Sequence, residues 1–201
     1  MHFSQRKHLK NFDITIKGEN INNLNSVRFL GVVIDSNMSW ESHSIEVCKK
    51  LNKLSFALYK LSKSVDQKTL LVVYHAYVVA TLRYGIIFWG NSTYRDLISR
   101  AKKKCIRAMC KLKPTDSCQP CFKSLRLLTF PSLYIYECCM FVKCNPDLFE
   151  VGRLASDSRL RPRKPYILTK TSKTAMMKKS VVQVAPQFYN SLVSELKDLC
   201  T

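Results

Sequence analysis

The fold is most constrained by an apolar, aromatic-rich segment that runs directly into a strongly basic one. Residues 74–91 read YHAYVVATLRYGIIFWGN, and residues 97–113 carry seven Lys and Arg with no Asp or Glu. The first segment has the composition of a buried helix, whereas the second has the pattern of a helix with one apolar and one cationic face. This combination predicts a helical module that binds a polyanion.

The charge of the whole chain favours the same class of partner. Its 201 residues include 33 Lys and Arg against 14 Asp and Glu, for a formal net charge of +19. Such an excess attracts phosphate backbones or anionic lipid and speeds encounter with them. Acidic small-molecule substrates fit less well, since an enzyme site needs local charge and not a global excess. A hydrophobic content of 46% is enough to build a core in one ordinary domain or two small ones.

The basic residues gather in two stretches, residues 95–126 and residues 153–179. Asp96 and Asp116 are the only acidic residues of the first stretch, and Asp157 is the only one of the second. A solvated surface normally mixes both signs of charge. The uneven distribution therefore favours two polyanion-binding patches over basic residues that merely solvate helices.

Cysteine usage and hydropathy bear on the compartment of the protein. The chain has nine cysteines, an odd number, and its N-terminus, MHFSQRKHLK, is polar and basic, unlike a secretory signal. These features predict an intracellular protein, nuclear or cytoplasmic, in a reducing environment. The apolar stretch over residues 69–82, which has no Asp, Glu, Lys or Arg, is shorter than the ~20 residues that span a bilayer, so no transmembrane segment and no membrane partner are expected.

Strands are predicted near the N-terminus and helices after it. Residues 12–17 alternate apolar and polar side chains, and residues 27–34 form a β-branched and aromatic run. Both stretches are typical of strands. We expect them to pair as a hairpin across residues 19–26.

Three helices are predicted next, from apolar residues at helical spacing. Ser39 is the expected N-cap of the first helix, and Asp66 of the second, which Gly85 ends. The third spans residues 94–112 and stops before Pro114. The apolar faces of the second and third helices comprise Leu70, Val73, Tyr77, Val78 and Leu82, and Leu97, Ile98, Ala101, Cys105, Ile106 and Met109. The basic residues of the third helix are expected to point outward.

The C-terminal part is expected to hold shorter elements. Helices are predicted over residues 122–128 and 132–144, and an irregular basic arm over residues 153–180. A last helix is expected after Pro186. These patterns predict an α+β, predominantly α-helical chain. Its expected parts are a β-hairpin in residues 1–36, a three-helix bundle in 37–113, a smaller helical extension in 114–150, and a basic arm with a C-terminal helix in 151–201.

A series of short sequences occurs in order along almost the whole chain: Phe29-Leu30-Gly31, Leu82-Arg83-Tyr84-Gly85, Trp89-Gly90, Leu127-Leu128-Thr129, Leu160-Arg161-Pro162-Arg163 and Tyr189-Asn190-Ser191-Leu192. This series resembles the C-terminal third of a jockey-like non-LTR retrotransposon reverse transcriptase. The resemblance implies that residues 12–35 are the end of the polymerase palm, with Phe29-Leu30-Gly31 near the strands that hold the primer terminus. Residues 40–112 would be the thumb, which grips the template-primer duplex, and residues after 114 a C-terminal extension.

The resemblance also bears on catalysis. The family is an RNA-directed DNA polymerase whose palm carboxylates, including an adjacent Asp pair, hold two Mg²⁺ ions. No two acidic residues are adjacent in this chain. We therefore expect no catalysis and no cofactor for this chain alone, which would be an inactive remnant or gene-model fragment of a mobile element. Its expected partners are RNA, DNA or their hybrid, and a separate palm and fingers portion could associate with it.

The candidate nucleic-acid-binding residues follow from the basic run and from the resemblance. The Lys102–Lys104 run, with Arg107 one turn on, is expected to contact phosphates from one helix face. Tyr84 and Trp89 would either stack on bases or pack in the core. The full set is Phe29, Leu30, Gly31, Arg83, Tyr84, Arg100, Lys102, Lys103, Lys104, Arg107, Arg161 and Arg163.

Two other classes of function stay open on the sequence. A zinc-dependent interaction module would use Cys118 and Cys121 with thiols from the set Cys138, Cys139 and Cys144, although buried free thiols explain these residues more simply. A basic peripheral membrane protein is the second alternative. His43 and His75 lie in helical patterns, where a core or surface histidine is a better explanation than a partner for a nucleophilic cysteine.

Overall fold

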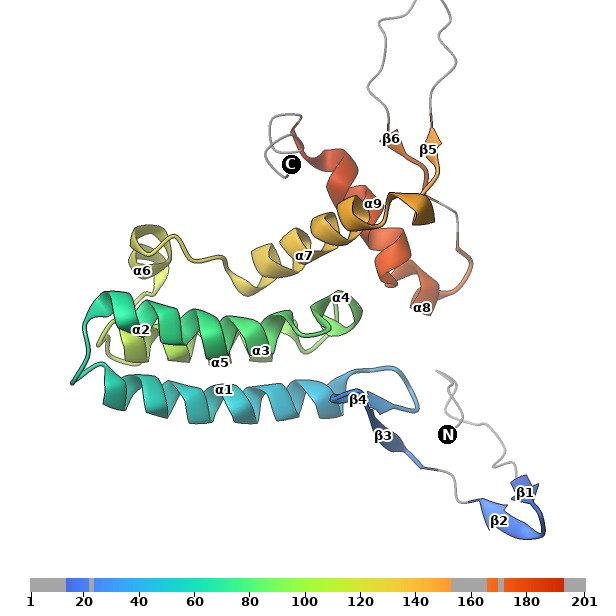
Figure 1. Ribbon diagram of the computed structural model, residues 1–201, viewed down its shortest axis with the longest axis horizontal. Helices are drawn as coiled ribbons and strands as arrows, with labels where there is room; N and C mark the ends of the chain where they lie inside the picture. Colours follow the sequence, from blue (N-terminus) through green and yellow to red (C-terminus); the bar gives the residue numbers. More distant parts are fainter. Residues whose placement is uncertain (1–13, 22–23, 153–165, 170–171, 194–201) are drawn as a thin grey trace, which may run out of the picture. The chain divides into compact units, whose positions relative to one another are not determined.

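The structure, a computed structural model, describes residues 14–21, 24–152, 166–169 and 172–193 (Figure 1). It is predominantly helical with small antiparallel hairpins, which confirms the predicted α+β class. The chain divides into two compact units. Residues 1–85 and 92–130 form the first, and residues 86–91 and 131–201 form the second. The finer division into four domains stays a prediction.

The N-terminal strands form two hairpins, so the predicted pairing of residues 12–17 with residues 27–34 is wrong. β1 (Ile14–Ile16) pairs with β2 (Glu19–Ile21), and β3 (Ser26–Phe29) pairs with β4 (Val32–Asp35). Each pair is joined by two residues with positive φ, Lys17-Gly18 and Leu30-Gly31. A two-residue loop with both φ values positive matches the right-handed twist of a tight hairpin. The run 27–34 therefore turns back on itself.

The first unit is built around three helical segments that share a core. α1 (Glu41–Leu61) packs against α5 (Arg95–Met109) and against a helix that runs back along it (Figure 1). That returning helix comprises α2 (Gln67–Val73), the π-helix η1 (Tyr74–Val79) and α3 (Ala80–Arg83). Its core side chains and those of its neighbours include Leu51, Leu58, Leu70, Tyr74, Val78, Leu82, Ile98, Cys105, Ile106 and Met109.

The starts of two helices test the predicted caps. Asp66 accepts hydrogen bonds from the backbone N–H groups of Lys68 and Thr69, as predicted for the N-cap of α2. Ser39 is not the N-cap of α1, because Trp40 takes that place with a φ of 66°. The carboxylate of Asp35 accepts from the N–H groups of Ser39 and Trp40, at 2.7 and 2.8 Å. A carboxylate at the end of β4 therefore fixes the turn into α1.

Two side chains predicted on apolar faces lie on the surface instead. Tyr77 is 59% exposed, while Tyr74 is fully buried in its place. The i→i+5 hydrogen bonds of the π-helix widen the turn, so residues four apart stay on one face and a residue three apart leaves it. Leu97 is also exposed, at 41%. α5 ends at Met109, before the predicted end, because Lys111 takes a positive φ of 56°.

The buried hydroxyl of Tyr74 gives a stability prediction. Within the described part of the chain, its oxygen has no hydrogen-bond partner, and burial raises the pKa of the group. A buried hydroxyl without a partner costs free energy. We expect Tyr74→Phe to stabilise the protein by about 1 kcal/mol, measured as a higher midpoint of urea unfolding. Exposed Tyr77→Phe is the control and should leave the midpoint unchanged. A lower midpoint for Tyr74→Phe would show that the hydroxyl is satisfied in solution.

The second unit contains five helices and one hairpin in its described residues. They are α4 (Ile86–Trp89), α7 (Phe130–Cys144), the 3₁₀ helix η2 (Pro146–Leu148), α8 (Ala175–Lys178), α9 (Val181–Ser191), and β5 (Val151–Gly152) paired with β6 (Tyr166–Ile167). α9 begins at Val181 and contains Pro186, so the prediction that the last helix follows Pro186 is wrong. α6 (Gln119–Ser124), in the first unit, begins and ends earlier than the predicted helix over residues 122–128.

A short hairpin forms in the region predicted to be an irregular basic arm, because β5 pairs with β6. Val151 pairs with Ile167, and Gly152 with Tyr166. The side-chain amide of Asn190 then bonds to both backbone groups of Ile167: its oxygen accepts from the N–H and its nitrogen donates to the carbonyl, each at 2.9 Å. Asn190 thus extends the pairing of β6 and holds the hairpin on α9. Residues 153–165 lie outside the described residues.

Candidate nucleic-acid interface

The β3–β4 turn and the end of α3 meet in the first unit, although 54 residues separate them in sequence. The Tyr84 hydroxyl donates a hydrogen bond to the carbonyl oxygen of Leu30. A Cβ added at Gly31 would lie 3.5 Å from the Tyr84 ring, so the ring packs against the turn. Phe29 and Leu30 are 60% and 74% exposed. The fold therefore brings two of the sequence-predicted groups together at one surface.

Tyr84 and Trp89, for which stacking and core packing were both open, have different environments. Trp89 is fully buried, whereas Tyr84 is 57% exposed. Core packing explains Trp89. Tyr84 offers part of its ring to solvent and contacts the β3–β4 turn at Leu30. Arg83, at the last turn of α3, is exposed as well.

α5 presents a basic face to solvent. Arg100, Lys103 and Lys104 are exposed, and Arg107 is half-buried. The spacings of three, four and seven residues place these side chains on one side of the helix. The Lys104 ammonium donates to Asn52 Oδ1 of α1 at 3.2 Å, so this face borders the surface of α1. Between Asp96 and Asp116 the sequence has no acidic residue to neutralise it.

Lys102 does not share this face, which corrects its predicted outward orientation. Its side chain is 2% exposed, and its Nζ donates to the carbonyl oxygen of Leu128 at 2.8 Å. Burial lowers the pKa of the ammonium from 10.5 to about 8. Position 102 is one residue after the buried Ala101 and three before the buried Cys105, so helical spacing turns it inward. Lys102 fastens the 125–129 segment to α5 and is removed from the candidate contact surface.

Arg107 combines a structural bond with a place at the edge of the basic face. Its Nε donates to the carbonyl oxygen of Asp116 at 3.0 Å. The Asp116 carboxylate in turn accepts from the N–H of Lys113 at 2.8 Å, which closes the loop after α5. A guanidinium has five N–H donors, so one bond to the loop leaves donors for a phosphate. Arg161 and Arg163, the remaining candidates, lie outside the described residues.

A second basic face, on α1, was missed as a site by the sequence analysis. Lys49, Lys53, Lys60 and the following Lys63 are exposed, and two large aromatic rings share their side of the helix. Phe56 is 63% and Tyr59 46% exposed. The signal was present in the spacing of residues 49, 53, 56, 60 and 63. It could have been found by asking which aromatic residues of α1 lie off its apolar stripe.

The cysteines are free thiols in the described part of the chain. Burial raises the pKa of Cys105 to about 12 and that of Cys138 to about 11, so both stay protonated. Burial, followed by a hydrogen bond with Cys121, raises the pKa of Cys110 to about 12. Protonated thiols are poor nucleophiles. Among the described residues, no group of three or more His, Cys, Asp or Glu side chains is arranged to hold a metal ion.

The two histidines considered as partners of a nucleophile have ordinary environments. His43 is 5% exposed, and its Nδ1 accepts from the N–H of Val33 at 3.4 Å, which joins α1 to β4. Burial lowers its pKa. His75 is exposed on η1. One is thus a core histidine and the other a surface histidine.

Comparison of the chain with protein-family models, with curated proteins and with solved structures finds no match. The resemblance to reverse transcriptases therefore stays a prediction from the sequence. None of the helices in the described ranges is both long and apolar enough to cross a membrane.

Proposed function

We propose that this chain binds nucleic acid without sequence specificity, as the thumb and C-terminal region of a retrotransposon reverse transcriptase would. RNA, DNA and their hybrid are the proposed ligands, since each offers a regular array of phosphates. The observation that carries the proposal is the basic face of α5, where Arg100, Lys103 and Lys104 are exposed together. Non-specific binding depends on such lysine and arginine contacts to phosphate.

The contact between Tyr84 and the β3–β4 turn supports the same proposal. The resemblance to reverse transcriptases implies that Phe29-Leu30-Gly31 belongs to the end of the palm and that Arg83-Tyr84 belongs to the thumb. The hydrogen bond from Tyr84 to Leu30 joins these two segments in one unit. The proposal assigns no catalytic step to this chain alone, because the adjacent palm carboxylates of the family have no counterpart in its sequence.

The salt dependence of binding tests the proposal. We expect the affinity for a labelled RNA–DNA hybrid, measured by fluorescence anisotropy over a series of KCl concentrations, to fall with a slope that reflects roughly 4–8 neutralised phosphates. Lys103→Gln should flatten the slope by about 0.9, the value for one lost phosphate contact. Arg100→Gln and Lys104→Gln should act in the same direction.

Lys102→Met is a matched control, since it removes one positive charge at the next position of the same helix. Its ammonium is buried against the Leu128 carbonyl, so the salt slope should not change. Circular dichroism would verify that all four variants keep their helices. Equal slopes for the wild type, Lys103→Gln and Lys104→Gln would exclude α5 as the contact surface. Absence of binding to RNA, DNA and hybrid would exclude the proposed function.

A further inference from the structure

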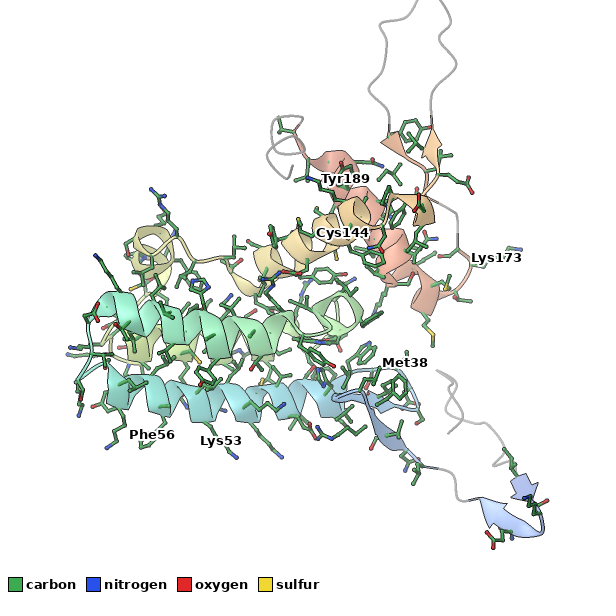
Figure 2. All side chains as sticks on the ribbon, in the orientation of Figure 1. Met38, Lys53, Phe56, Cys144, Lys173 and Tyr189 are labelled. Carbon is green, nitrogen blue, oxygen red and sulfur yellow. The ribbon has the colours of Figure 1, made fainter. Side chains whose placement is uncertain are left out.

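The exposed face of α1 combines lysines with aromatic rings in one continuous row. Lys49, Lys53, Phe56, Lys60 and Lys63 follow one another at intervals of four, three, four and three residues, which is the spacing of one helix face. Figure 2 shows Lys53 and Phe56 extending from α1 on the side away from α2 and α3. After Glu46 the helix carries no acidic residue. The row therefore has four lysines and no acidic residue, and the aromatic ring of Phe56 lies among them.

The two rings on this face are not explained by the core. α1 buries Leu51 and Leu58 on its opposite side, while Phe56 and Tyr59 are 63% and 46% exposed. Each ring has an ammonium beside it: Lys60 Nζ lies 5.4 Å from the Phe56 centroid, and Lys63 Nζ lies 4.7 Å from the Tyr59 centroid. A group that stacks on either ring would meet a positive charge at the same time.

We propose that this face binds an unpaired strand of nucleic acid, with Phe56 and Tyr59 stacking on bases and the lysines of α1 contacting its phosphates. The inference rests on the proposed function and adds the class of ligand and a second surface. A single strand offers both groups that the face recognises, a row of phosphates and accessible base planes. The bases of a duplex are already stacked on one another, so a duplex could use only the lysines.

The neighbourhood of α1 favours a strand over the other polyanionic surface, a membrane. A helix that lies on lipid buries a continuous apolar face, whereas the main apolar face of α1 is packed in the core. On its exposed face, Lys53 and Lys60 flank Phe56 on either side along the helix. The bond from Lys104 to Asn52 also places this face beside the basic face of α5. A duplex on α5 could then continue as an unpaired strand along α1.

An abasic oligonucleotide separates stacking from phosphate contact, because it keeps every phosphate and lacks the bases. The wild type should bind a single-stranded oligonucleotide more tightly than its abasic counterpart of equal length. Phe56→Ala/Tyr59→Ala should weaken binding to the ordinary strand about 25-fold, from about fivefold for each ring at the lower end of measured stacking effects. Binding to the abasic strand and the salt slope should stay as in the wild type.

Tyr77→Ala is the matched control, since Tyr77 is 59% exposed on η1 and should not alter either affinity. The inference is overturned if the wild type binds ordinary and abasic strands equally, or if the double variant keeps the preference for bases. A third outcome would show that the face binds lipid instead: phosphatidylserine vesicles bind the wild type but not the double variant, and the wild type does not prefer the ordinary strand to the abasic one. That outcome also overturns the inference. A retained affinity for duplex in these cases would leave the proposed function standing, whereas loss of all nucleic-acid binding would remove both.

Discussion

Gly90→Ala is expected to destabilise the second unit by about 3 kcal/mol, at the upper end of the cost of overpacking. A Cβ at position 90 would lie 2.5 Å from Cδ2 of the Tyr134 ring and 2.6 Å from the carbonyl oxygen of Ile86. The second neighbour is backbone and also accepts the N–H of Gly90 at 2.7 Å. Neither atom can move without disturbing α4 or the buried ring, so the glycine is required for a close approach.

Unfolding in urea, followed by tryptophan fluorescence, would measure this loss. The chain has two tryptophans, and a Trp40→Phe background leaves Trp89 as the reporter next to the substitution. Gly152→Ala in the same unit is the matched control. Its nearest neighbour would be the end of the Leu168 side chain, at 2.9 Å, which can turn away. Adding Tyr134→Leu to Gly90→Ala should recover part of the stability. A midpoint for Gly90→Ala as high as that of the wild type would contradict the prediction.

Lys102→Met is expected to stabilise the first unit at pH 7 by about 3 kcal/mol, on the scale of 1.36 kcal/mol for each pKa unit. The buried ammonium has a pKa of about 8, against 10.5 for an ordinary lysine, and desolvation is the main cause. Methionine has a similar length and no charge to bury. The carbonyl of Leu128 loses its partner, which offsets part of this gain.

The stabilisation by Lys102→Met should depend on pH in a defined direction. The folded wild type releases the Lys102 proton near pH 8 and the unfolded chain near pH 10.5. Between these values the unfolded state binds more protons, so this group makes the wild type more stable as the pH rises. The advantage of the variant should therefore shrink between pH 8 and pH 10.5.

Urea unfolding of wild type and Lys102→Met at several pH values would test both statements. The difference between the two proteins is the quantity to follow, because the buried thiols and phenols titrate in both and cancel. Lys103→Met is the control: its side chain is exposed, so its substitution should change the stability only slightly. A destabilised Lys102→Met at pH 7 would show that the bond to Leu128 outweighs the cost of burying the charge.

The sequence predicted most elements because local signals placed them. Asp66 caps α2 as expected, and most of the apolar face predicted for α5 is buried, although Leu97 is exposed and the unpredicted Lys102 is buried. Strand pairing was wrong because the decisive signal was the backbone of two tight turns, where Leu30 and Lys17 take positive φ without being glycine. A non-glycine residue with positive φ is uncommon. The β-branched residues of the 27–34 run therefore predicted one continuous strand, although Gly31 lies within it.

In the candidate site, too, some features follow from the local sequence and others from tertiary contacts. By itself, the sequence determined the basic character of the protein, the positions of its main helices and the alignment of Arg100, Lys103 and Lys104 along one of them, since charge and helical period are local properties. The tertiary structure decided that Lys102 is buried, that Tyr84 meets the Leu30 turn, and that Phe56 and Tyr59 lie open among lysines. Whether a side chain is exposed depends on which other segment packs against it. Leu128 lies 26 residues from Lys102 in the sequence, and Tyr84 lies 54 residues from Leu30, so neither contact is a local property.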